Sequence, residues 1–154
     1  MKSRTKLFVI LIMILSTKLH AQVGKIDSEK IVLVCPFEHG SGREPKEAFT
    51  WDPPDKKVIM ISKVDSFIRS ATSGVVTNMN PIEDNQYEIV VNFGDYYFWY
   101  YGVTKPFVAK ADVVKAGQSI GLYTLGKELE FRMFKFEDPI DPRIYLECKI
   151  PKAQ

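Results

Sequence analysis

The sequence predicts an all-β domain, mainly antiparallel, and three observations lead to this class. Short apolar or alternating runs follow one another from residue 58 to residue 136, with turn residues between them. In residues 87–93, Tyr, Ile, Val and Phe occupy every second position, which is the period of a strand with a buried face. No segment keeps a helical period for more than about two turns.

The expected strands are separated by recognisable turn signals. Gly94 and Asp95 connect two of them as a hairpin, and residues 78–85 form a turn cluster of Asn, Pro and Asp. Residues 36–55 are rich in Gly, Pro, Glu and Lys and predict a long loop, whereas 109–115 predicts one short helical turn. The strands are expected at 31–35, 58–61, 67–70, 75–77, 87–93, 96–101, 118–123 and 128–136.

The first 21 residues have the organisation of an export signal. A basic start with Lys2, Arg4 and Lys6 precedes an apolar run over 7–15 that is too short to span a membrane, and Ala21 offers a cleavage point. We therefore expect three parts: a signal peptide at 1–21, an arm and long loop at 22–56, and a domain at 57–150. The mature protein should be secreted or periplasmic, with no transmembrane anchor after cleavage.

Charge excludes one class of partner. The chain has 21 basic and 19 acidic residues, and four of the basic residues lie in the signal. Cleavage leaves 17 basic against 19 acidic residues, a formal net charge of −2. Binding of nucleic acid, which requires a basic face, is not expected.

The chain has two cysteines, Cys35 and Cys148. Export permits a disulfide between them. The alternative is a pair of separate buried thiols, because Cys35 ends the apolar run 31–35. The sequence leaves both interpretations open.

Several motifs, in a fixed order, resemble a known family. They are Ser70–Val76 (SATSGVV), Glu88–Asp95, Phe98–Val103, Val114–Gly121 (VKAGQSIG) and Pro139–Leu146 (PIDPRIYL). Together they resemble the lysostaphin-type, LytM-like murein zinc metallopeptidase domain over residues 58–146. The resemblance implies a lysostaphin-like β-sandwich or barrel-sandwich hybrid.

The resemblance also implies a metal site whose ligands this chain lacks. The family binds zinc through two His and one Asp and carries a further catalytic His. The position of the His in its Tyr-x-His-Leu strand is Gly102 here, and its His-x-His pair reads Glu128 and Glu130. Met60 and Ile61 stand near the remaining ligand positions.

A histidine count leads to the same expectation. The chain has His20, inside the signal, and His39, so one mature chain cannot supply a two-His zinc site. We expect no catalytic residue, no metal and no cofactor.

Two other kinds of site are open. Glu128 and Glu130 lie on one face of a strand and, with Asp95 or Asp55, would form an oxygen-ligand site for a harder cation. The simpler interpretation is a solvated pair of acids. His39 with Ser41 would make a Ser/His pair, although a lone loop histidine is more often solvated.

A carrier domain is a third alternative. The hairpin motif Gly-Gln-Ser-Ile-Gly also occurs in lipoyl and biotinyl carriers. Lys127, however, lacks the acid-Lys or Met-Lys-Met context of a modified lysine.

The aromatic run 96–101 supplies a candidate binding surface. Alternation places Tyr97, Trp99 and Tyr101 on the face opposite Tyr96, Phe98 and Tyr100. One set belongs to the core, and the set of Tyr97, Trp99 and Tyr101 is a candidate for stacking against sugar rings or a partner chain. Cross-strand stabilisation is the alternative role.

The sequence thus favours an exported, non-catalytic peptidase-fold protein that binds peptidoglycan or a cell-wall hydrolase partner. The alternative is a divergent metal-dependent cell-wall endopeptidase with an atypical carboxylate site.

Overall fold

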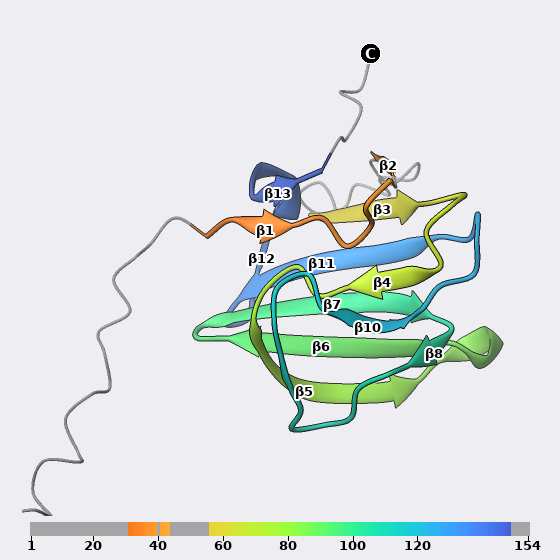
Figure 1. The fold of residues 1–154 in the computed structure, drawn as a ribbon. Helices are drawn as coiled ribbons and strands as arrows, with labels where there is room; N and C mark the ends of the chain where they lie inside the picture. Colours follow the sequence, from red (N-terminus) through yellow and green to blue (C-terminus); the bar gives the residue numbers. More distant parts are fainter. Residues whose placement is uncertain (1–30, 40, 44–55, 149–154) are drawn as a thin grey trace, which may run out of the picture. The chain divides into compact units, whose positions relative to one another are not determined.

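The computed structural model describes residues 31–39, 41–43 and 56–148, which lie in one compact unit that begins at Ile31 (Figure 1). The predicted signal peptide, most of the arm, and the 44–55 part of the long loop lie outside the described residues. The regular elements of the described part are β-strands and two short 3₁₀ turns, η1 (Glu83–Asn85) and η2 (Pro142–Ile144). The all-β, mainly antiparallel class is confirmed.

The larger of two stacked sheets has antiparallel pairing throughout. Its order is β2-β3-β11-β7-β6-β5-β9, and β12 pairs with the end of β11 on the edge that faces away from β7, next to β3. The strands are β2 (Ser41–Arg43), β3 (Lys57–Ile61), β5 (Gly74–Pro81), β6 (Tyr87–Phe93), β7 (Tyr96–Val103), β9 (Val113–Val114), β11 (Leu129–Lys135) and β12 (Asp138–Ile140).

A small sheet, in the order β4-β10-β8, stacks on one face of the large sheet (Figure 1). It consists of β4 (Phe67–Arg69), β10 (Ser119–Leu122) and β8 (Lys105–Pro106). A parallel pair, β1 (Leu33–Val34) with β13 (Leu146–Glu147), joins the two ends of the described chain.

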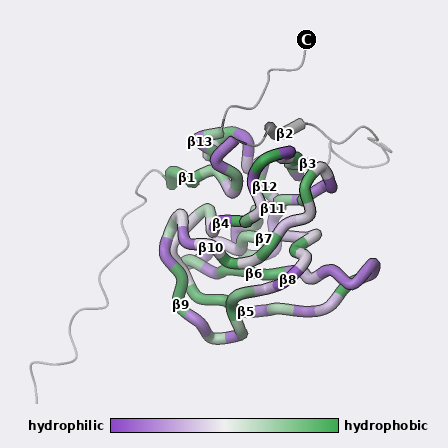
Figure 2. The backbone as a smooth tube through the Cα atoms, turned by 45° about the vertical axis from the view of Figure 1, so that its right-hand side comes forward, coloured by the Kyte–Doolittle hydropathy of each residue, from purple (hydrophilic) through white to green (hydrophobic). Residues whose placement is uncertain are grey.

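One hydrophobic core fills the space between the sheets. Ile68 and Ile120 come from the small sheet, and Ile89, Phe98 and Tyr100 from the large one, all fully buried. Along β7 and β11, buried side chains alternate with side chains that face away from the core, as the period of two requires. The middle of β6 is hydrophobic, whereas the connection between β5 and β6 is hydrophilic (Figure 2).

Two local expectations differ from the structure. Residues 113–114 form β9, an edge strand, instead of part of a helical turn at 109–115. The cause is backbone pairing with β5: Ala111 N–H donates to Val76 O, and Val76 N–H donates to Asp112 O, both at 2.8 Å. Within the expected long loop, residues 41–43 form β2, which pairs with β3.

Cys35 and Cys148 form a disulfide between residues 113 positions apart in the chain. It lies beside the parallel pair of β1 and β13, where Leu33 pairs with Leu146. The link therefore fixes the first described strand against the last one.

Candidate binding face on the large sheet

The outer face of the large sheet carries the candidate surface that the sequence predicts. The cross-strand register puts Trp99 between Val90 and Arg132, and Tyr97 between Asn92 and Phe134. In the next row, Tyr101 lies between Glu88 and Glu130. Because Phe98 and Tyr100 point into the core, these side chains face away from it.

An aromatic groove of about 610 Å³ runs along this face. Trp99 is 36% exposed, and its ring centroid lies 5.6 Å from that of Phe134 with the two rings tilted by 51°. Tyr101 lies on the same face, 41% exposed, outside the groove itself. The groove is lined by aromatic and polar side chains, among them Asn78, Tyr97, Trp99, Phe134, Phe136 and Glu137.

Beside the groove, Glu130 lies at the centre of an ion-pair cluster. Lys57 Nζ lies 2.9 Å from Glu130 Oε2, and Arg132 Nε donates to Glu130 Oε1. The Lys57 and Glu130 side chains are only 18% and 19% exposed, so the pair is partly shielded from water. The sequence contains a signal for half of this cluster, because Glu130 and Arg132 are two residues apart on a strand and must share a face.

Gly102 has a backbone that excludes a side chain. Its φ is +108°, a region that L-residues rarely adopt, and a Cβ built there would lie 2.8 Å from Glu128 O. A histidine at this position would require β7 or the start of β11 to move. Gly102 is the position that the motif resemblance matches to the family's catalytic histidine, and here the backbone leaves no room for that side chain.

The other sequence-predicted positions do not assemble around a cation. Glu128 is exposed and precedes β11, whereas Met60 is fully buried in the core. Asp95 precedes Tyr96, which pairs with Lys135, and Glu130 lies five residues further along β11, roughly 17 Å away by strand geometry. Asp55 lies outside the described residues.

The side chains of the described residues do not form a metal site. Among these residues there is no group of three or more His, Cys, Asp or Glu side chains that could hold a metal ion. The carboxylate of Glu130, which the motif resemblance matches to a zinc ligand, is already paired with two cationic side chains. The residues present do not fit a zinc ion.

His39 has a different partner from the one considered in the sequence. Its Nδ1 lies 3.2 Å from Asp65 Oδ1, and its backbone N–H donates to Asp65 Oδ2 at 2.9 Å. The side chain of Ser41 lies outside the described atoms. Sequence reasoning missed Asp65, because nothing in a single chain pairs a carboxylate with a histidine 26 residues away.

Known proteins share this fold at low sequence identity. No protein-family model matches the chain, and neither does any curated protein. Among solved structures, Helicobacter pylori Csd3 is 24% identical with a TM-score of 0.64, over 80% of this chain and 35% of that one. A peptidase M23 from Pseudomonas aeruginosa is 16% identical with a TM-score of 0.61, over 76% of this chain and 51% of that one.

A third structure with this fold is described as the SpoIIQ–SpoIIIAH pore-forming complex. The matched chain is 17% identical with a TM-score of 0.60, over 76% of this chain and 92% of that one. The present chain spans about a third of the Csd3 chain, 35%.

These likenesses confirm the fold that the motifs predict: a lysostaphin-like domain of the LytM/M23 peptidase type. In this domain the described residues contain no zinc-ligand group. The fold and the residues described thus agree with a degenerate LytM-like domain. Within the described residues, no helix has the length and hydropathy of a membrane span.

Proposed function

We propose that this protein is an exported, non-catalytic relative of the M23-type peptidases that binds peptidoglycan through the aromatic groove. The observation that carries the proposal is the position of Lys57 and Arg132 on Glu130. The motif resemblance aligns Glu130 with a zinc-binding histidine, and two cationic side chains of this chain already contact its carboxylate.

Electrostatics opposes a metal at this position. A divalent cation that approached Glu130 would meet the ammonium of Lys57 at close range, and the repulsion between like charges in a partly shielded site is large. Glu130 also cannot reach the two further protein ligands that a catalytic zinc requires among the described residues.

The chemistry of the groove suits sugar rings. A pyranose has an apolar C–H face that stacks on Trp or Phe, and hydroxyls around its edge that hydrogen-bond to amides and carboxylates. Trp99 and Phe134 supply the aromatic surface. Asn78 and Glu137 supply polar groups at the rim. The glycan strands of peptidoglycan provide repeated rings of this kind.

Sedimentation with purified peptidoglycan sacculi tests the proposal. The mature protein should co-sediment, and Trp99→Ala should weaken binding by about tenfold, which corresponds to the loss of one good stacking contact. Phe107→Ala is a matched control, because Phe107 is an exposed aromatic residue outside the groove. Failure of the wild type to sediment would contradict binding to peptidoglycan and favour a protein partner such as a cell-wall hydrolase.

The divergent endopeptidase has its own test. Metal analysis of the purified protein, with a murein digestion assay, should show neither stoichiometric metal nor cleavage products. Stoichiometric metal together with cleavage that is lost in Glu130→Ala would overturn the non-catalytic assignment.

Export is tested separately. N-terminal sequencing of protein recovered from the periplasm or culture medium should begin at Gln22. An intact N-terminus on cytoplasmic protein would contradict the signal peptide and the localisation that depends on it.

A further inference from the structure

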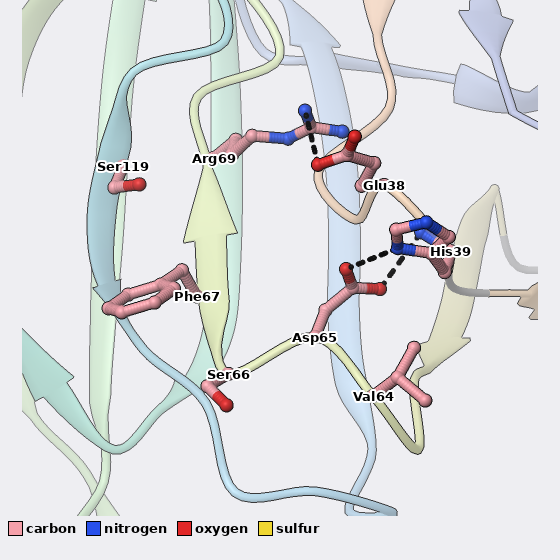
Figure 3. Close-up of a pocket in the computed structure, with 8 residues that line it drawn as sticks. All are labelled: Glu38, His39, Val64, Asp65, Ser66, Phe67, Arg69 and Ser119. Carbon is pink, nitrogen blue, oxygen red and sulfur yellow. Dashed lines mark hydrogen bonds and ion pairs between the residues drawn. The ribbon is translucent and has the colours of Figure 1, made fainter.

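A second pocket lies on the outer face of the small sheet, on the opposite side of the core from the aromatic groove. Its volume is about 530 Å³. It is formed by β4, the turn before it, and the segment that follows β1 (Figure 3). We call it the Arg69 pocket, and its principal side chains are Glu38, His39, Val64, Asp65, Phe67 and Arg69.

The register of β4 places Arg69 in this pocket. Ile68 points into the core, so Phe67 and Arg69 project together from the outer face, and Arg69 pairs across the sheet with Ser119. The backbone N–H of Arg69 donates to Pro36 O at 2.9 Å, which holds the segment with Glu38 and His39 alongside.

The guanidinium of Arg69 has more donors than its neighbours use. Its Nε is buried and has no hydrogen-bond partner among the described residues. Nη2 reaches Cys35 O at a long 3.4 Å, and Nη1 lies 3.7 Å from Glu38 Oε2, beyond hydrogen-bond length. A guanidinium with five donors normally takes a carboxylate or phosphate in a bidentate arrangement, so this one lacks a good acceptor.

The two acids of the pocket differ in how firmly they are held. Asp65 accepts from Ser62 Oγ at 2.7 Å and from the His39 backbone N–H at 2.9 Å, and its other oxygen faces His39 Nδ1 (Figure 3). Glu38 has a side chain that is 67% exposed, and its one contact with a described side chain is the long one with Arg69. The Asp65 side chain is therefore held in place by its hydrogen bonds, whereas the Glu38 side chain can rotate away from Arg69 into solvent.

We propose that the Arg69 pocket binds the C-terminal carboxylate of a peptide. The ligand carboxylate takes the place of Glu38 on the guanidinium and accepts the two parallel hydrogen bonds that Glu38 does not. The terminal side chain rests on Phe67 and Val64, which are 50% and 66% exposed.

Charge favours a carboxylate over a phosphate. Exchange of the Glu38 carboxylate for another monoanion leaves the charge around Arg69 unchanged. A dianionic phosphate would add negative charge beside Asp65, and like charges at this range repel. A planar carboxylate also matches the fork of the guanidinium.

Calorimetric titration of the mature protein with N-acetyl-leucyl-leucine tests the proposal. The free acid should bind with a Kd at or below about 1 mM. The C-terminal amide of the same peptide should bind at least about tenfold more weakly, because it has lost the charged acceptor. Inorganic phosphate should not bind detectably at the same concentration.

Three variants assign the effect to the pocket. Arg69→Lys keeps the charge but loses the fork and should weaken binding of the acid by about tenfold. Glu38→Gln removes the competing carboxylate and should tighten it by about twofold to fivefold. Trp99→Ala, on the opposite face, should leave it unchanged. Thermal melting checks that each variant is folded.

Equal binding of the acid and the amide, no saturable binding of the acid, or a folded Arg69→Lys variant with undiminished affinity would each overturn the proposal. These outcomes are independent of sedimentation with sacculi, so the two proposed sites can fail separately.

Discussion

Lys57 Nζ lies 2.9 Å from Glu130 Oε2, and this contact joins β3 to its neighbour β11 in the large sheet. The register of β3 and β11 makes Ile59 the direct partner of Glu130 and Lys57 that of Arg132, so the three charged side chains lie on one face. A partly buried carboxylate such as that of Glu130 would be costly without a cation beside it. The chain supplies that cation from its own side chains.

A double-mutant cycle on Lys57 and Glu130 measures this compensation. Lys57→Met and Glu130→Gln, alone and together, should give a coupling free energy of about 1 kcal/mol. This value is at the upper end of the range for exposed ion pairs, because both side chains are mostly shielded from water. Urea unfolding provides the measurement. The control Glu83→Gln, in the exposed turn η1, should change stability by less than about 0.5 kcal/mol. A coupling energy of zero would show that the pair contributes nothing to the fold.

The hydroxyl of Tyr100 should be essential for stability. It accepts the Ala71 backbone N–H at 2.7 Å, and both residues are fully buried. Tyr100→Phe leaves that N–H without an acceptor and should lower the free energy of unfolding by about 1–3 kcal/mol. Tyr101→Phe, one residue along and 41% exposed, is the matched control and should be close to neutral. Similar losses in the two variants would contradict the assignment to the buried hydrogen bond.

The same tyrosine predicts an alkaline loss of stability. Burial raises the pKa of Tyr100 to about 12 from the ordinary value of 10.0. Between these two values the unfolded chain ionises and the folded chain does not, so stability falls as the pH rises. The expected loss from this group is about 2–3 kcal/mol between pH 10 and 12. Unfolding curves of Tyr100→Phe should show a shallower decline over this window.

Two carboxylates, those of Asp65 and Asp141, should lower the stability of the fold at acid pH. Burial raises the pKa of Asp65, but hydrogen bonds from Ser62 and His39 outweigh it, and the pKa lies below 3.8. The Arg143 side chain lowers the pKa of Asp141 in the same direction. The stability that each provides is present above the unfolded pKa and is lost as the pH falls through the folded one. Asp65→Asn should flatten the stability profile below pH 4, and an unchanged slope in the folded variant would contradict this assignment.

Periodicity predicted the fold well, because apolar alternation is read directly from one strand. The faces of β7 follow from it: Phe98 and Tyr100 are core, and Tyr97, Trp99 and Tyr101 lie opposite. Features that depend on two distant segments could not be predicted. The partner of Glu130 comes from β3, and the partner of Asp65 from the segment after β1. β9 was missed because its cause is backbone pairing with β5, which side-chain pattern does not record.

Reduction of the Cys35–Cys148 disulfide should destabilise the domain strongly. The bond closes a loop between residues 113 positions apart, and it fixes the parallel pair of β1 and β13. In the chain-entropy description, a loop of this length corresponds to about 4–5 kcal/mol, because the cross-link restricts the unfolded chain. Urea unfolding of the oxidised protein and of the Cys35→Ser/Cys148→Ser variant provides the comparison.

Because β1 and β13 pair through only two residues each, we expect the variant to lose this pairing before the two stacked sheets unfold. Hydrogen exchange would show this as early exchange at Leu33. Equal stability with and without the cross-link would mean that packing of Leu33 and Phe37 alone holds the segment in place.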